Sequence, residues 1–177
     1  MLISLIFFCV EAVPSNAYLA NKHEQGSLER VIENRYEKLS IKQRQKAPPA
    51  PALAERLVLI RKMYNIKPDL MLAIMGHESA FNPKAYNKKT RDFGIMQINI
   101  KTAQAYEINK GCILDWECSL VAGAKILSDF KTRYSKKESE WYIRYNIGTT
   151  RNKMKINILG KKYATAINKQ LVLINTM

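Results

Sequence analysis

The chain has 177 residues and a formal net charge of +14, from 29 Lys and Arg against 15 Asp and Glu. This length allows one domain with its own core plus an extension, and the charge favours anionic partners such as nucleic acid, membrane surfaces or cell-wall polymers. The basic residues are spread along the chain, without a recognisable nucleic-acid motif or a series of stacking aromatics. We therefore expect a basic surface that keeps the protein near an anionic envelope, and no nucleic-acid partner.

Residues 1–17 have the pattern of a secretory signal peptide. Residues 2–10 form an apolar run too short to span a bilayer, and Ser15-Asn16-Ala17 provides a small-x-small cleavage site. The pattern departs from the usual one in having no Lys or Arg before the apolar run. We expect an exported protein of the periplasm or cell envelope, without an integral membrane span once this leader is cleaved.

Residues 18–46 predict an N-terminal helical extension. Apolar residues recur at helical spacing after Ser27, which suits an N-cap position. The Pro-rich stretch 47–52 then predicts a short stiff linker that ends the helix. The extension either packs back on the following domain or meets a partner. The sequence leaves both open, with packing on the core as the default.

Residues 53–177 predict a single, mainly helical domain. We expect helices at 52–64, 68–80, 101–106, 115–134, 138–146 and 162–174. Between Phe81 and Gln97 lies an irregular stretch rich in Asn, Pro and Gly, in which the strand signal is faint. The predicted fold class is therefore all-α, with at most a small irregular or β-hairpin lobe.

The cysteines and histidines argue for a disulfide and against a metal site. Removal of the leader would leave Cys112 and Cys118, which are six residues apart and could either form a disulfide in an oxidising compartment or remain free thiols. The chain has only two histidines, His23 and His77, and they do not form the second closely spaced ligand pair that would complete a zinc site with these cysteines. His77-Glu78 begins like a zinc-protease motif, but Phe81 stands where the second histidine should be. We expect no metal and no cofactor.

Glu78 is the most informative residue, because it is a carboxylate on an apolar helix face. Met71, Ile74, Met75 and Glu78 fall at i, i+3, i+4 and i+7 of the helix predicted from Pro68. Apolar surroundings and the negative end of the helix dipole both raise the pKa of a carboxyl group. A carboxyl that holds its proton near neutral pH is what a general acid needs. The alternative is a partly exposed Glu at a frayed helix end.

Three motifs follow in order along the chain: Glu78 to Pro83 (Glu-Ser-Ala-Phe-Asn-Pro), Gly94 to Gln97 (Gly-Ile-Met-Gln), and Arg144 to Gly148 (Arg-Tyr-Asn-Ile-Gly). Together they resemble the motifs of the lytic transglycosylases, lysozyme-like enzymes that cleave the glycan strands of peptidoglycan. That family writes them approximately as Glu-Ser-x-Phe-x-Pro, Gly-Leu-Met-Gln and Ala-Tyr-Asn-x-Gly. The resemblance covers residues 53–171. It departs from the family where Ile95 replaces Leu and Arg144 replaces a small residue.

The resemblance implies cleavage of the β-1,4 bond between N-acetylmuramic acid and N-acetylglucosamine with a single carboxyl group. Glu78 would first protonate the glycosidic oxygen. As a carboxylate, it would then deprotonate the C6 hydroxyl of the muramic acid, which closes on C1 and leaves a 1,6-anhydro end without water. The N-acetyl group of the substrate is expected to help stabilise C1.

The same resemblance implies substrate-binding roles for six further residues: Ser79, Met96, Gln97, Tyr145, Asn146 and Tyr163. Tyr145 is expected to hydrogen-bond Glu78 and to help set its protonation, and Gln97 offers a donor and an acceptor to an N-acetyl group. Plainer interpretations exist for several of them. Ser79 could bond the helix backbone, Met96 could belong to the core, and the Tyr145-Asn146 pair could simply end a helix.

Asp92 is the residue that could change the reaction. The resemblance extends to goose-type lysozymes, which place aspartates near an attacking water, so an Asp92 that reaches the cleft would favour hydrolysis. The plainer interpretation, which we favour here, is an exposed loop aspartate paired with Arg91 or a lysine.

The leading hypothesis is an exported peptidoglycan lytic transglycosylase. Its size, leader and motifs resemble those of the specialised enzymes that open the wall for secretion, conjugation or pilus machinery, which residues 18–46 could contact. The alternatives are a hydrolytic muramidase that uses Asp92, a basic wall-binding assembly protein with weak or no catalysis, and a cytosolic nucleic-acid binder. An intact Glu78 argues against the second alternative and the leader against the third.

Overall fold

The computed structural model describes residues 15–176, so the leader predicted at residues 1–17 lies outside the described residues except for its last three. Helices make up most of this part of the chain, and three two-residue strands form an antiparallel sheet in the order β1-β2-β3. The predicted fold class, a helical lysozyme-like domain with a small β lobe, is confirmed.

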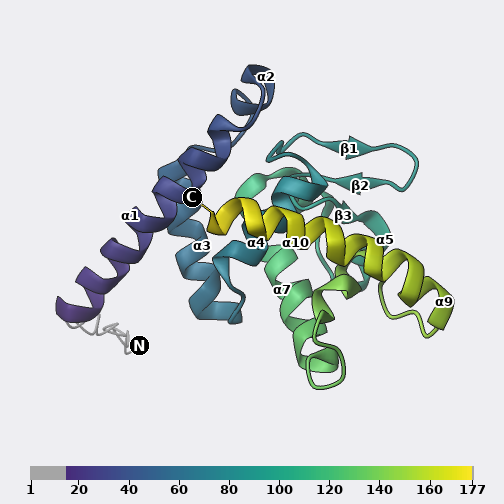
Figure 1. Cartoon of the computed structure of the whole chain (residues 1–177). Coiled ribbons are helices and arrows are strands. Elements are labelled where there is room, and N and C mark those ends of the chain that lie inside the picture. The colour runs from purple at the N-terminus through teal and green to yellow at the C-terminus, as the bar shows by residue number, and fades with distance from the viewer. Residues whose placement is uncertain (1–14, 177) are drawn as a thin grey trace, which may run out of the picture.

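Helix α10 runs alongside α4 through the middle of the molecule, with α1 and α3 at one end and the β lobe and α9 at the other (Figure 1). The elements are α1 Ser15–Glu37, α2 Ile41–Arg44, α3 Ala50–Tyr64, α4 Pro68–Glu78, β1 Tyr86–Asn87, β2 Asp92–Phe93, β3 Ile98–Asn99, α5 Ile100–Ala105, α6 Lys110–Leu114, α7 Trp116–Tyr134, the 3-10 turn η1 Trp141–Ile143, α8 Arg144–Ile147, α9 Lys153–Lys155, the π-helical turn η2 Ile156–Gly160, and α10 Lys161–Asn175.

Helix α4 is the buried centre of the fold. Its residues from Met71 to Met75 are all 0% exposed, so this helix packs against neighbours on every side and not along one stripe. It ends at Glu78, two residues earlier than predicted, because Ala80 and Phe81 adopt positive φ angles of 50° and 62° that turn the chain away. The proposed acid is therefore the last residue of a helix whose central five residues are fully buried.

The N-terminal helix packs on the domain, which is the default that the sequence offered. Helix α1 contacts α3, and its residues Leu28, Ile32 and Tyr36 join the same hydrophobic core as the rest of the chain. Ser27, expected to cap this helix, lies inside it, and the helix ends at Glu37. Helix α3 begins at Ala50, with a proline in its first turn, so the linker predicted at 47–52 is shortened to three residues.

A buried arginine organises the segment after α7. The helix predicted at 138–146 is replaced by the turn η1 and the short helix α8, which begins at Arg144. Arg144 is 4% exposed, donates to both carboxylate oxygens of Glu138 and to the carbonyl oxygen of Thr150 at 2.7 Å, and stacks over the ring of Tyr134. The chain folds around this side chain, which fixes the position of α8.

Cys112 and Cys118 form a disulfide that joins α6 to α7, with a distance of 5.0 Å between their Cα atoms. Between them, Asp115 accepts a hydrogen bond from the Cys118 amide and caps α7.

Among residues 15–176, no helix combines the length and apolar character needed to cross a membrane.

Gly94 places the β lobe directly against α6. Its φ is +77°, and a Cβ atom at this position would lie 2.1 Å from the carbonyl oxygen of Ile113. Glycine alone combines this backbone conformation with so close an approach. The glycine of the second motif is therefore required by packing, independently of any contact with substrate.

We expect Gly94→Ala to lower the free energy of unfolding by about 3 kcal/mol or more, because the new Cβ would overlap a backbone carbonyl that cannot move aside easily. Urea denaturation of the two proteins measures this difference. Gly148→Ala is the matched control, since Gly148 also has a positive φ, +63°, but a Cβ atom added to it would have no atom within 4 Å. Its ψ of −150° also lies in a region that essentially only glycine populates, so this variant should lose about 1–3 kcal/mol from backbone strain alone. Equal losses for the two variants would show that the close contact at Gly94 does not matter.

Candidate active site

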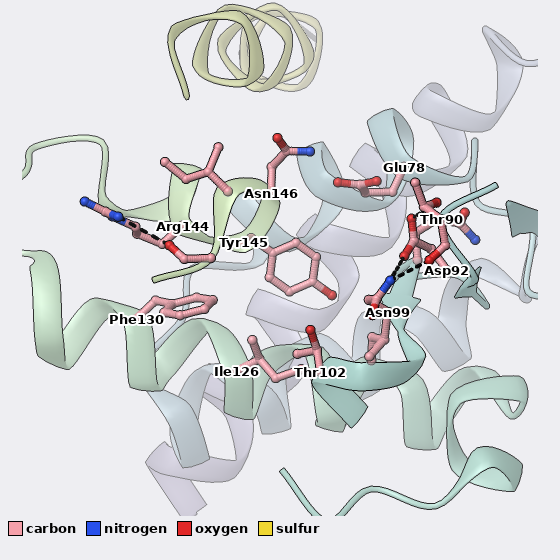
Figure 2. Close-up of a pocket in the computed structure, with 14 residues that line it drawn as sticks. Glu78, Thr90, Asp92, Asn99, Thr102, Ile126, Phe130, Arg144, Tyr145 and Asn146 are labelled. Carbon is pink, nitrogen blue, oxygen red and sulfur yellow. Dashed lines mark hydrogen bonds between the residues drawn. The ribbon is translucent and has the colours of Figure 1, made fainter. Parts of the chain in front are cut away.

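A cavity of about 380 Å³ lies at the C-terminal end of α4, between the β lobe and the helices α7 and α8 (Figure 2). Its lining is mainly polar on the side of the β lobe and apolar on the side of α7. The lining residues are Glu78, Thr90, Asp92, Gln97, Ile98, Asn99, Thr102, Ile126, Phe130, Arg144, Tyr145, Asn146, Ile147 and Gly148. Residues from all three sequence motifs therefore meet at one cavity.

The carboxyl group of Glu78 is half-buried and faces this cavity. Its pKa is raised from 4.5 to about 7, chiefly by burial, because removal from water disfavours the charged form. A hydrogen bond from Tyr163 acts in the opposite direction and lowers the pKa, and the nearby charge of Asp92 raises it. The net result is a carboxyl group that is partly protonated at neutral pH, as a general acid and base must be.

Tyr163 of α10 is the partner of Glu78. Its hydroxyl donates to Oε1 of Glu78 at 2.8 Å, and the ring is 3% exposed. Burial and the charge of Glu78 raise the pKa of Tyr163 well above its ordinary value, so it remains a donor at any physiological pH. The ring also makes an edge-to-face contact with His77, with 5.4 Å between the ring centroids.

Tyr145 does not make the hydrogen bond to Glu78 that the sequence led us to expect. Its hydroxyl donates instead to the carbonyl oxygen of Met96 at 2.9 Å, while its ring lines the cavity beneath Glu78 and beside Asn146 (Figure 2). The two tyrosines have therefore exchanged the expected roles: Tyr163 contacts the carboxyl group, and Tyr145 supports the wall.

Two residues expected to contact sugar are committed to the scaffold. Met96 is 0% exposed, and a Cβ atom added to Gly123 would lie 2.7 Å from its Cε, so this side chain fills the core beside α7. The hydroxyl of Ser79 lies 2.7 Å from the carbonyl oxygen of Ile95 and 3.1 Å from that of Met75. Neither Met96 nor Ser79 lines the cavity. The plainer interpretations of both residues fit the structure.

Gln97 and Asn146 remain at the cavity surface. The amide nitrogen of Gln97 donates to the carbonyl oxygens of Gly94 at 2.9 Å and Ala85 at 3.1 Å, which leaves its amide oxygen as the group available to a ligand. Asn146 projects from α8 toward the side of the cavity that holds Glu78 (Figure 2). These two amides are the neutral polar groups best placed to bind sugar substituents.

Asp92 lies at the cavity and is half-buried, so the expectation of an exposed loop aspartate is wrong. Its oxygens accept hydrogen bonds from the hydroxyl of Thr90 and from the amide nitrogen of Asn99, the latter at 2.8 Å. No ion pair links Asp92 to Arg91 or to any other basic residue within the described range. The strand pairing of β2 with β3 sets Asp92 opposite Asn99 and thereby fixes its orientation.

Arg144 is the lining residue whose importance the sequence did not reveal. It stands where the family has a small residue, yet it is neutralised by Glu138 and holds α8 in place. Its partner Glu138 lies six residues upstream, and in a regular helix two residues at that spacing lie on different faces. The helix predicted at 138–146 therefore gave no indication that these two side chains meet. Among residues 15–176, no group of three or more His, Cys, Asp and Glu side chains is arranged to hold a metal ion.

Comparison with known proteins identifies the family. Residues 59–168 match the model of the transglycosylase SLT domain, which spans more than half of the chain. The chain is 35% identical over 123 residues to invasion protein IagB of Salmonella typhimurium (strain SL1344), covering 66% of this chain and 74% of IagB. It is 33% identical over 114 residues to protein IpgF of Shigella flexneri, covering 60% of this chain and 72% of IpgF. The chain belongs to the transglycosylase SLT-domain family and is a lytic transglycosylase.

Proposed function

We propose that this enzyme cleaves the bond between N-acetylmuramic acid and N-acetylglucosamine with Glu78 as its one catalytic carboxyl group. The observation that carries the proposal is a carboxyl group with a pKa of about 7, hydrogen-bonded by a buried tyrosine at the edge of a polar cavity. At this pKa both protonation states are populated near neutral pH, so one group can serve as acid and then as base.

In the first step protonated Glu78 gives its proton to the glycosidic oxygen as the bond to C1 breaks. The resulting carboxylate then takes the proton of the C6 hydroxyl, whose oxygen closes on C1. Glu78 thus returns to its starting state, and the product carries a 1,6-anhydro ring. The hydrogen bond from Tyr163 stabilises the Glu78 carboxylate between the two steps. Burial raises the pKa of Glu78, so the carboxylate takes up the second proton readily.

We assign Gln97 and Asn146 to substrate binding, because they present amide groups to the cavity. Tyr145 and Tyr163 act as positioning residues: the first lines the cavity and is fixed there by its bond to the Met96 carbonyl oxygen, and the second orients Glu78. Ser79 and Met96 hold the scaffold that carries Glu78 and Gln97.

The cellular role that we propose is local opening of the wall, by an exported enzyme, for a secretion, conjugation or pilus machine. Its support is the similarity to a protein named for invasion, together with the basic charge and the leader pattern of residues 1–17. The exposed side of α1, within residues 18–46, is the surface that we propose for contact with such a machine.

A hydrolytic muramidase is the second candidate, favoured by the position of Asp92 in the cavity. A carboxylate that positions a water on the far side of C1 would give hydrolysis in place of ring closure. The two candidates differ in product: ring closure leaves 1,6-anhydro ends, and hydrolysis leaves reducing ends with an added water.

We expect Glu78→Gln to lower the rate of peptidoglycan cleavage by at least about 100-fold, because it removes both the acid and the base. Digestion of purified peptidoglycan with analysis of the fragments by mass spectrometry measures this loss. The native enzyme should give 1,6-anhydro ends that are absent with the variant. Undiminished cleavage by Glu78→Gln would rule out Glu78 as the catalytic group, and no cleavage by either protein would favour the wall-binding alternative.

The control for this experiment is a stability measurement, which should show that Glu78→Gln remains folded. Because the pKa of Glu78 is raised from 4.5 to about 7 by folding, the native protein binds the proton more tightly than the unfolded chain and loses stability as pH rises between these values. The neutral amide avoids this loss. The variant should therefore melt at a higher temperature than the native enzyme at pH 8, with a smaller difference or none at pH 4.

We expect Tyr163→Phe to move the alkaline limb of kcat/KM to higher pH, because it removes a hydrogen bond that lowers the pKa of Glu78. The pH profile of kcat/KM on soluble glycan fragments measures this shift. In the native enzyme kcat/KM should fall above about pH 7. Tyr145→Phe is the matched control, since its hydroxyl bonds Met96 and not Glu78. An unchanged limb in Tyr163→Phe would contradict the assignment of Tyr163.

We expect Asp92→Asn to move the same limb to lower pH, because it removes a negative charge that raises the pKa of Glu78. In the transglycosylase the products of this variant keep their 1,6-anhydro ends. Mass spectrometry of the digest distinguishes the alternative: reducing ends made by the native enzyme and lost in Asp92→Asn would establish hydrolysis through Asp92.

A further inference from the structure

The C-terminal part of the chain has an unusual charge distribution. From Trp141 to Met177 there are seven Lys or Arg and no Asp or Glu, so these residues supply half of the net charge of +14. Arg144 is buried against Glu138, but most of the other basic side chains are exposed. The positive charge is most concentrated around the turn formed by α9 and η2.

Three large apolar side chains are exposed within residues 153–162 of this basic region. Met154 is 65% exposed, Ile158 59% and Leu159 46%. Exposed lysines flank them along the chain, and we call this set the α9–η2 patch: Lys153, Met154, Lys155, Ile158, Leu159, Lys161 and Lys162. Single exposed apolar residues are ordinary, but three of them on ten residues of chain mark an interaction surface.

The opposite side of the same segment is packed on the domain. A Cβ atom at Gly160 would lie 2.9 Å from Cδ1 of Ile143, so η2 approaches the turn η1 without a gap. Tyr163, one turn later, is buried against Glu78. The segment is therefore amphipathic, with a small inner face fixed to the domain and a basic, aliphatic outer face.

We propose that the α9–η2 patch docks on an anionic lipid bilayer. Lysines flanking exposed aliphatic side chains are the pattern of a segment that lies in the membrane interface, where the amines meet lipid phosphates and the aliphatic chains enter the acyl boundary. The patch has no aromatic ring, carboxylate or amide-rich surface that would favour a sugar chain, and its charge complements a phosphate-bearing surface.

Docking by this patch would orient the active site. Helix α8, which carries Tyr145 and Asn146 into the cavity, contacts η2 directly. In Figure 1, α9 lies at the end of α10 farthest from α1, so an enzyme held by α9 would leave α1 free for another partner. The proposal does not depend on the catalytic assignment of Glu78.

The test compares binding of the full chain and its variants to vesicles of phosphatidylcholine alone and of equal parts phosphatidylcholine and phosphatidylglycerol. We expect binding to the anionic vesicles only, reduced on the order of 100-fold or more when the four patch lysines are replaced by Gln. The triple variant Met154→Ser, Ile158→Ser, Leu159→Ser should also bind more weakly, because the aliphatic side chains enter the bilayer.

Matched controls use exposed residues at the other end of the molecule. The quadruple variant Lys38→Gln, Lys42→Gln, Lys46→Gln, Lys62→Gln removes the same charge, and Met63→Ser removes an exposed methionine of α3. Both should bind like the native chain. All of these variants should digest soluble glycan fragments at the native rate, so a failure of docking is distinguishable from a failure of catalysis.

Hydrogen–deuterium exchange locates the contact whatever residues 1–17 contribute. Anionic vesicles should protect the amides of residues 153–162, and protection elsewhere with none in this segment would overturn the proposal. Equal losses in the patch and control lysine variants would mean attraction by overall charge. Loss in the patch lysine variant but not in the triple Ser variant would mean surface attraction without insertion. Equal losses, or no binding by the native chain, reject docking by the patch, whereas loss in the patch lysine variant alone rejects insertion of its aliphatic side chains.

Discussion

The rest of the site depends on the burial of one carboxyl group at the end of an apolar helix. Five consecutive residues of α4 are fully buried, and the helix delivers Glu78 from this core to the edge of the cavity. Burial raises the pKa of Glu78, and the hydrogen bond from the hydroxyl of Tyr163 lowers it by stabilising the carboxylate. A deeper carboxyl would never ionise, and an exposed one would lose its proton well below neutral pH. The packing of α10 on α4 sets this balance.

Most of the motif side chains around this carboxyl group act on the backbone. Ser79 bonds the carbonyl of Ile95, Gln97 bonds that of Gly94, and Tyr145 bonds that of Met96. These bonds connect the end of α4, the β lobe and α8 to the backbone of residues 94–96. The motifs therefore describe how the cavity is built as much as what it touches. A carboxyl group that gives one proton and then takes another from a different atom must be held precisely, and these bonds provide that support.

The sequence predicted the parts of the fold that depend on local pattern. Helix α4 and Glu78 followed from apolar periodicity and a proline at the first turn, and the β lobe was faint because its strands are two residues long. The expectation that Tyr145 bonds Glu78 was wrong, because which tyrosine reaches this carboxyl group depends on how α10 packs on α4. The role of Arg144 was equally hidden, because its partner Glu138 is brought to it by an irregular turn.

The same contacts explain why a second carboxylate in the cavity is compatible with chemistry that uses one. Each oxygen of Asp92 already accepts a hydrogen bond, from Thr90 and from Asn99, so the side chain is held in one orientation by the β lobe. From there its charge raises the pKa of Glu78 without a direct contact. A fixed negative charge that raises the pKa of Glu78 keeps a larger fraction of this carboxyl group protonated near neutral pH, as a general acid must be. In a transglycosylase, Asp92 can therefore act through its charge on Glu78. In a hydrolase, a carboxylate at the same position would have to direct a water molecule.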